Sequence, residues 1–247
     1  MPLNLKEGAI FIADAHYPRN KKELLALFDF LIHSPPPQCF LLGDIFEFAC
    51  PKLPYSLAYN EELIAKIKAL SLKTELFYLE GNHDYLLKEL FLNAKVYSMQ
   101  EQPLIVAYHN GKAAIFHGDK HGDFLYALYS KLIRSPFVIS ILRVVTLDIN
   151  GRFIKSLYKK LLAKNICGEF AGFAERKKTA LKKYDSHGAN LIIEGHSHQR
   201  VSLDVNGLKY EALEAFACTK SFFKVKFEHN DIRFVKMSLG ALKDGQA

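Results

Sequence analysis

The chain has 247 residues, of which 49% are hydrophobic and 24% are charged. That length suffices for one large α/β domain or for a domain with an insertion, and the apolar fraction is enough for a full core. No segment reaches the roughly 18 uncharged apolar residues that a membrane-spanning helix requires, and the N-terminal residues are typical of a core strand rather than a signal peptide. We therefore expect a protein that is soluble or bound at a membrane surface.

The net charge of +7 is unevenly distributed along the chain. Residues 124–185 contain 13 Lys or Arg and 4 Asp or Glu, whereas the remainder is slightly acidic. A basic segment of this kind suits an anionic lipid surface, nucleic acid or an anionic substrate, and a solvated basic helix face would have the same composition. Charge alone leaves these alternatives open.

The four cysteines lack the spacing of a metal site or of a redox pair. Cys39, Cys50, Cys167 and Cys218 form no CxxC motif. This pattern predicts neither a disulfide framework nor a structural zinc site. A reducing cytosol is the compartment that it favours.

The first half of the chain alternates predicted strands and helices. Asn20 is the expected N-cap of the first helix. Apolar runs and helical spacing predict strands at residues 8–13, 39–42 and 75–79, and helices at residues 21–33 and around 57–70. Each strand runs straight into a polar segment. In α/β sheets, ligands gather beyond the carboxyl ends of the strands, so this placement is the one that a site needs.

The second half changes character. An Asn110-Gly111 turn predicts a hairpin, and residues 123–184 are typical of helices that are interrupted at Ser135-Pro136 and Asn150-Gly151. The remaining predicted strands are residues 104–108, 113–116 and 190–194, followed by a tail of antiparallel strands at 201–204, 208–213, 222–228 and 232–237. We interpret residues 1–247 as a single metal-binding domain in which residues 123–185 form a helical cap insertion.

Five short segments at predicted strand ends carry the chemistry. They are Asp14-Ala15-His16, Gly43-Asp44, Gly81-Asn82-His83-Asp84, His117-Gly118-Asp119 and Gly195-His196-Ser197-His198. The candidate metal ligands among them are Asp14, His16, Asp44, Asn82, His117, His196 and His198. Seven such ligands can hold two divalent cations about 3.5–4 Å apart, with the Asp44 carboxylate as a bridge. A pair of cations produces a metal-bound hydroxide near neutral pH, which predicts in-line attack on phosphorus without a side-chain nucleophile.

Two residues beside the ligand Asn82 are candidates for catalysis. His83 could protonate the leaving-group oxygen or stabilise the phosphoryl charge, and Asp84 could hold the ring and tautomer of His83. A single Asn-His-Asp segment is usually only a loop. The predicted role therefore depends on the five segments occurring together.

The order of these five segments resembles the signature of calcineurin-like metallophosphoesterases. The resemblance spans residues 14–198 and implies a four-layer α-β-β-α sandwich. It implies one metal held by Asp14, His16, Asp44 and His198, and another held by Asp44, Asn82, His117 and His196. It also implies His83 as the acid-side histidine, paired with Asp84. Manganese is the metal that such enzymes commonly use.

One branch of that family is the most similar. This chain looks like the UDP-2,3-diacylglucosamine hydrolases of lipid A synthesis in three respects. These are its length, the segment Gly43–Glu47 and the helical cap after His117-Gly118-Asp119. Those enzymes release UMP and a diacylated sugar phosphate at the cytoplasmic face of the inner membrane. An acyl groove could be lined by Phe124, Leu125, Leu128, Leu132, Phe137, Ile141, Leu142 and Val145, with Arg134, Arg143 and Arg152 binding phosphate or lipid headgroups.

The substrate has alternatives. The lipid enzymes typically have arginine at the position of His83, and their cap motif is only loosely matched by His121-Gly122-Asp123-Phe124. A soluble phosphoesterase acting on nucleotides, dinucleoside polyphosphates or phosphoproteins is therefore the second hypothesis. The apolar cap would then pack on itself or on a partner. A nucleic-acid partner is disfavoured, because the basic segment has few alternations of aromatic and basic residues of the kind that stack bases.

Overall fold

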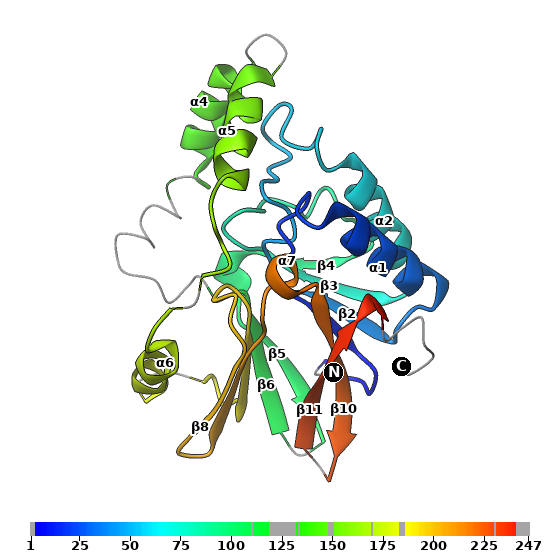
Figure 1. The fold of residues 1–247 in the computed structure, drawn as a ribbon, viewed down its shortest axis with the longest axis vertical. Coiled ribbons are helices and arrows are strands. Elements are labelled where there is room, and N and C mark those ends of the chain that lie inside the picture. Colours follow the sequence, from blue (N-terminus) through cyan, green and yellow to red (C-terminus); the bar gives the residue numbers. More distant parts are fainter. Residues whose placement is uncertain are drawn as a thin grey trace.

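The computed structural model describes residues 3–109, 111–118, 132, 134–147, 151–168, 170–182, 186–229 and 231–240. Two β-sheets stack face to face, and helices cover the outer face of the first sheet (Figure 1). This arrangement confirms the expected α/β sandwich. Among the described residues, no helix is long and apolar enough to cross a membrane.

The first sheet has six strands in the order β11-β10-β1-β2-β3-β4. Strands β1 to β4 run parallel, and β10 joins the free side of β1 in the antiparallel direction. Their bounds are β1 Ile10–Ile12, β2 Gln38–Leu41, β3 Glu75–Leu79, β4 Lys95–Tyr97, β10 Ser221–Glu228 and β11 Asp231–Ser238. The central strands are buried on both faces, which explains why their sequences are continuous apolar runs rather than alternating ones.

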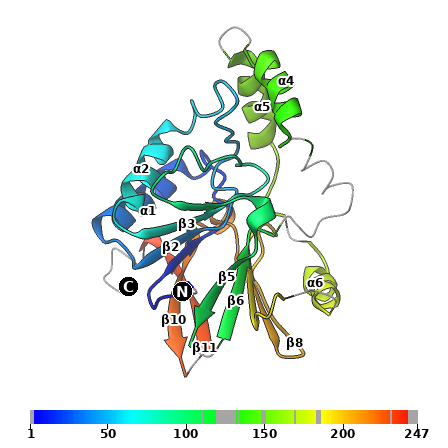
Figure 2. The same cartoon turned by 180° about the vertical axis from the view of Figure 1, so that it is seen from behind.

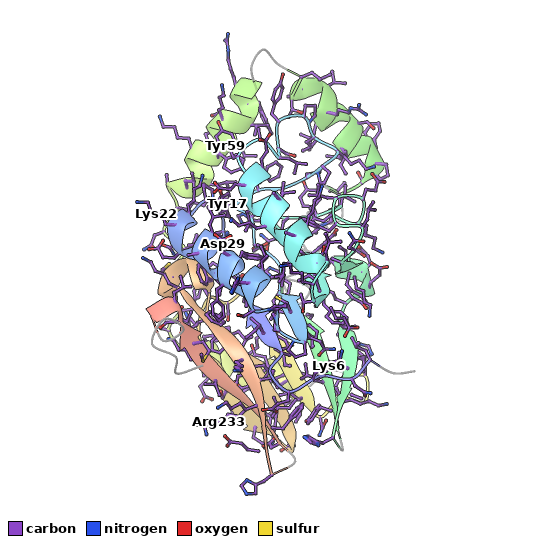
Figure 3. All side chains as sticks on the ribbon, turned by 90° about the vertical axis from the view of Figure 1, so that its right-hand side faces the viewer. Lys6, Tyr17, Lys22, Asp29, Tyr59 and Arg233 are labelled. Atoms are coloured by element: carbon purple, nitrogen blue, oxygen red, sulfur yellow. A yellow bond between two sulfur atoms is a disulfide. The ribbon has the colours of Figure 1, made fainter. Side chains whose placement is uncertain are left out.

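Helices α1 (Lys21–His33) and α2 (Glu61–Ser71) lie side by side on the outer face of the first sheet (Figure 3). Leu24, Phe28 and Leu31 recur at helical spacing and are buried against the sheet. The predicted helix at residues 21–33 is confirmed in both bounds. Asn20 occupies the N-cap position, as predicted, but its side chain makes no capping hydrogen bond. Its backbone is left-handed, with φ of 46°, and its side-chain amide donates to the carbonyl of Ala217 at 2.6 Å.

The second sheet has five strands in the order β5-β6-β7-β9-β8. Its members are β5 Leu104–Tyr108, β6 Gly111–Phe116, β7 Leu191–Glu194, β8 Val201–Val205 and β9 Leu208–Ala212. The predicted tail of antiparallel strands is thus divided. The β8–β9 hairpin joins the second sheet, where β9 lies parallel to β7, and the β10–β11 hairpin joins the first. Local alternation cannot distinguish these two destinations.

The first sheet contributes aromatic side chains to the interface between the two sheets. The ring of Phe40 stacks on Phe11 at 4.4 Å between centroids and on Phe77 at 4.6 Å, and all three are fully buried. Ile115 and Ile193 of the second sheet belong to the same buried cluster. This layer fixes how the two sheets face each other.

The predicted helical cap contains α4 (Pro136–Val145), α5 (Arg152–Leu162) and α6 (Phe173–Leu181) in its described part. Ser135-Pro136 begins α4, because the Ser135 hydroxyl accepts from the amide of Val138. Figures 1 and 2 show α4 and α5 together at one end of the molecule and α6 apart from them, near β8. Both expected boundaries of the cap, residues 123 and 185, lie outside the described residues, as does the whole of His121-Gly122-Asp123-Phe124. The cap therefore stays a prediction.

We expect Phe40→Ala to lower the free energy of unfolding by about 3–5 kcal/mol, because it removes the central ring of the three-ring stack and leaves a cavity. Urea titration followed by circular dichroism measures the change. The matched control is Leu92→Ala, since Leu92 is 83% exposed. A loss for Phe40→Ala no larger than that of the control would contradict the packing role.

Candidate metal centre

The seven predicted ligands come from loops that follow strands of both sheets. Five of them lie in the left-handed region of backbone conformation, which non-glycine residues adopt in only a few per cent of cases: Asp14, His16, Asp44, His196 and His198, with φ between 46° and 62°. Such conformations concentrate at sites where the surrounding structure dictates them. The loops therefore turn these side chains back over the strand ends.

One cluster gathers Asp14, His16 and His198, whose ligand atoms all lie within 4.8 Å of one another. The Nε2 atoms of His16 and His198 are 3.2 Å apart, and His198 Nε2 lies 3.5 Å from Asp14 Oδ1. Gly195 permits this approach, since a Cβ there would lie 2.6 Å from Asp14 Oδ2. Asp14 and His16 are fully buried, so their polar atoms face each other rather than water.

A second cluster gathers Asp44, His117 and His196. His117 Nε2 lies 3.5 Å from Asp44 Oδ2 and 3.2 Å from His196 Nδ1. The side-chain oxygen of Asn82 is 3.4 Å from the same His117 nitrogen, so this predicted amide ligand belongs to the second cluster. All seven predicted ligands are thus brought to one place, divided into two adjoining groups.

The donor atoms of both clusters fit divalent cations. Asp14 Oδ1 is buried and has no hydrogen-bond partner among the described residues, a costly arrangement that a cation bound by the first cluster would relieve. The buried Nδ1 of His16 has none either, but it faces Glu47 at 3.8 Å, because Nε2 is the His16 atom on the side of His198. Burial lowers the pKa of His16 to about 3 and that of His196 to about 4, so both imidazoles are neutral at pH 7 with a lone pair to donate. Carboxylates and neutral imidazoles together suit Mn²⁺, Fe²⁺ and Zn²⁺.

Both aspartates are held in the charged form that a cation requires. Burial on its own would raise the pKa of Asp44, but nearby His117 and His83 hold it well below its usual range. For Asp14, the nearby imidazoles of His198 and His117 likewise outweigh burial and lower the pKa.

Backbone carbonyls orient two of the histidine rings. The Nδ1 atom of His117 lies 2.7 Å from the carbonyl oxygen of Leu42, and the Nδ1 atom of His198 lies 2.6 Å from that of Ile166. Because a carbonyl only accepts, these contacts place the proton on Nδ1 and direct each Nε2 toward its cluster. Ile166 follows α5, so the end of the predicted cap takes part in the metal centre.

The predicted catalytic residues occupy different positions from those expected. Asp84 was expected to hold the His83 ring, and this prediction is wrong, because the Asp84 carboxylate binds other groups. Its buried carboxylate accepts the amides of Asp44, Ile45, Phe46 and Gly81 and the hydroxyl of Tyr78. The Nδ1 atom of His83 instead lies 2.7 Å from the carbonyl oxygen of Glu47. Asp84 therefore holds the ligand loops, and His83 lines the pocket over the clusters.

Glu47 is a buried residue of the site to which the sequence analysis assigned no role. It was named there only as the end of the segment Gly43–Glu47. Its carboxylate accepts from Arg19 Nε at 2.7 Å and lies 3.8 Å from His16 Nδ1, and it joins His16 and His83 in a third compact group. Arg19 also donates to the carbonyl of Leu161 at 2.8 Å. Only the fold brings residues 19, 47 and 161 together, so no local pattern could have revealed them.

The three predicted substrate-binding arginines are dispersed. Arg134 donates to the carbonyl of Gly81 at 2.7 Å, next to the ligand Asn82, and lies over the Tyr85 ring. Arg143 on α4 and Arg152 at the start of α5 are exposed. Their role stays a prediction, and the predicted groove residues Phe124, Leu125 and Leu128 lie outside the described residues.

A disulfide joins Cys167 to Cys218, 51 residues apart in sequence. The prediction of no disulfide framework does not hold for this pair, and the argument from the cysteines for a reducing compartment loses its basis. Cys167 follows the end of α5, and Cys218 lies in α7 (Phe216–Thr219), a short helix that the sequence did not reveal. Spacing carries no signal for such a pair, because the contact arises only when the cap returns to the sandwich. Cys39 and Cys50 are buried free thiols.

The sandwich and its two adjoining clusters define a candidate two-cation hydrolase centre. A family model described as calcineurin-like phosphoesterase matches residues 9–200. The chain therefore belongs to the calcineurin-like phosphoesterases and is a metal-dependent hydrolase of phosphoric esters, which confirms the resemblance inferred from the five segments.

Curated relatives share the family at low identity. A UDP-2,3-diacylglucosamine hydrolase of Coxiella burnetii (strain Dugway 5J108-111) is 22% identical over 205 residues, covering 80% of this chain and 84% of the relative. One of Blochmanniella pennsylvanica (strain BPEN) is 25% identical over 219 residues, covering 81% and 83%. Among solved structures, an archaeal phosphodiesterase aligns with a TM-score of 0.46 at 12% identity, over 93% of this chain and 99% of its own.

We expect Asp44→Ala to lower turnover of an aryl phosphodiester by more than about 100-fold, because even changes outside the ligand shell of metal sites cost about 10- to 100-fold. Elemental analysis of the purified variant should show fewer than two cations per chain. The control is Asp29→Ala, an exposed carboxylate on α1 that is labelled in Figure 3. Full activity and full metal content in Asp44→Ala would contradict the predicted bridging role.

Proposed function

We propose that the chain hydrolyses the diphosphate of UDP-2,3-diacylglucosamine, giving UMP and a diacylated sugar 1-phosphate, with two Mn²⁺ ions as its cofactors. The names of the curated relatives support this substrate. The structural observation that carries the proposal is α4, which exposes four large apolar side chains to solvent alongside the polar Ser140 and Arg143. Phe137 is 75% exposed, Val144 71% and the neighbouring Leu147 62%.

Exposed apolar side chains of this size suit acyl chains. Contiguous exposed apolar surface generally marks a site for lipid or another apolar partner. A phosphoesterase for small polar substrates has no need of it. The opposite side of α4 is anchored, since Ile139 packs with Cys50, Leu53 and Tyr85 in a small buried cluster.

The α4–α5 pair is tied to the loops that carry the clusters. Arg134, just before α4, binds the carbonyl of Gly81, and Tyr158 of α5 donates to the carbonyl of Phe48 at 2.5 Å. Gly81 precedes the ligand Asn82, and Phe48 follows Glu47. A lipid bound along α4 would therefore have its polar end close to the metal centre.

The two clusters account for the chemistry of the proposed reaction. Divalent cations bound there supply Lewis acidity to phosphoryl oxygens and lower the pKa of bound water. His83 lies at the pocket, with its ring 4.9 Å from that of His16. Since the carbonyl of Glu47 fixes the proton on Nδ1, Nε2 is the atom of His83 available to the substrate. We assign to the imidazolium form of His83, which carries a proton on each ring nitrogen, the donation of the Nε2 proton to the leaving-group oxygen.

We expect rapid UMP release from UDP-2,3-diacylglucosamine in the presence of Mn²⁺ and its loss with a chelator. The same preparations are assayed with a generic aryl phosphodiester, which reports the metal chemistry without the lipid. Cleavage of the aryl ester alone would eliminate the lipid substrate. It would favour the second candidate, a soluble phosphoesterase for nucleotides, dinucleoside polyphosphates or phosphoproteins, to which His83 is also suited.

We further propose that the protein works in the cytoplasm, peripherally on the inner membrane. The basic residues Lys155, Lys159 and Lys160 are exposed on α5. Helix α5 lies next to α4 (Figure 1). Apolar side chains that insert between headgroups and lysines that meet anionic lipids reinforce each other at a bilayer surface.

We expect the double variant Phe137→Asp with Val144→Asp to bind vesicles of phosphatidylglycerol and phosphatidylethanolamine at least about tenfold more weakly than the native chain, because two charges replace inserted apolar groups. Cosedimentation measures this binding. Leu92→Asp is the control, since Leu92 is exposed but lies outside the cap. Equal binding by the native chain and the double variant would refute membrane docking through α4.

A further inference from the structure

The pocket over the metal centre, about 550 Å³ in volume, has two walls of different character. One wall holds predicted ligands, and the other comes from residues 165–177 at the end of the predicted cap. Among the described residues that line this pocket, Lys177 is the only lysine or arginine. An anionic substrate bound at the clusters would therefore find one cationic side chain beside it.

The Lys177 ammonium is held in place rather than extended into solvent. It forms an ion pair with the carboxylate of Glu194, and its side chain is only 17% exposed. Its nitrogen lies 5.4 Å from the ring centre of Tyr210 and 6.0 Å from that of Phe173. The Tyr210 hydroxyl donates to the same Glu194 oxygen that Lys177 contacts, which fixes the carboxylate in turn. Glu194 thus acts as a positioning residue for Lys177.

This arrangement places the ammonium beside a ligand loop. Glu194 ends β7 and directly precedes Gly195-His196, and its side chain lines the same pocket as the cluster ligands. An ammonium carries three N–H donors. Since Glu194 is its one carboxylate partner among the described residues, Lys177 keeps donors for a group that enters the pocket.

A diphosphate ester has two phosphoryl groups, and the cation clusters are suited to the one that is attacked. The second is also anionic and needs a counter-charge within the same pocket. We propose that Lys177 binds the phosphoryl group that is not attacked and so makes the site selective for diphosphates over single phosphoryl groups. This inference rests on the proposed function for its substrate class, and it assigns a contact to a specific residue.

The test compares the binding of UMP with that of α,β-methylene UDP, a diphosphate analogue that is not hydrolysed, by calorimetry on Mn²⁺-loaded protein. The readout is the ratio of the two dissociation constants. We expect Lys177→Met to lower the preference for the diphosphate by about 10- to 100-fold, the usual contribution of a hydrogen bond to a charged group. Lys177→Arg should retain most of the preference.

Two further variants control for loss of stability and for a general effect of charge. Lys177→Met leaves the Glu194 charge buried without its partner, which destabilises proteins, so Lys177→Met with Glu194→Gln is measured in parallel and should lose the same preference. The matched control is Lys178→Met, since Lys178 is the adjacent, exposed lysine of α6. It should bind both nucleotides as the native chain does.

The outcomes separate this inference from the proposed function. An unchanged ratio in both Lys177→Met variants overturns the role of Lys177, whether or not UDP-2,3-diacylglucosamine is cleaved. An equal loss in the Lys178→Met control overturns it as well, because a general charge effect would then suffice. A ratio that falls only in the Lys177→Met variants supports the inference even where the lipid substrate is not hydrolysed.

Discussion

A single buried carboxylate holds the ligand loops of this protein together. Asp84 accepts four backbone amides and the Tyr78 hydroxyl, and the amides come from the loop after β2 and the loop after β3. Burial and the nearby charge of Asp44 raise its pKa to about 7, while the surrounding N–H donors favour the carboxylate. The positions of Asp44 and Asn82 therefore both depend on this one acceptor. A hydrophobic residue of similar size would leave several buried amides without partners.

Much of the sandwich was predictable because its elements have strong local patterns. The strand Glu75–Leu79 and the helix Lys21–His33 have the predicted bounds, since each is a continuous apolar or helically spaced run that ends at polar residues. The gathering of the seven candidate ligands also followed from the sequence, because residues after parallel strands share one edge of a sheet. Their assignment to individual cations remains a prediction.

The remainder could not be read from local patterns because it depends on contacts between distant segments. Asp84 and His83 are adjacent in sequence yet point to different partners, which only the paths of the Gly43-Asp44 and Glu47 backbones decide. The Arg19–Glu47 ion pair and the parallel placement of β9 beside β7 likewise arise from tertiary structure. Strand β4 escaped detection because its three residues are too short to show alternation.

The disulfide between Cys167 and Cys218 links two segments that both support the first cluster. Ile166, next to Cys167, holds the ring of His198, and the amide of Ala217, next to Cys218, donates to the carbonyl of Asp14. The bond thus connects the outer supports of two neighbouring ligands through one covalent link. The end of the cap cannot move away from the Asp14 loop while that link is intact. The relative positions of Asp14 and His198 are therefore constrained by a covalent bond as well as by packing and hydrogen bonds.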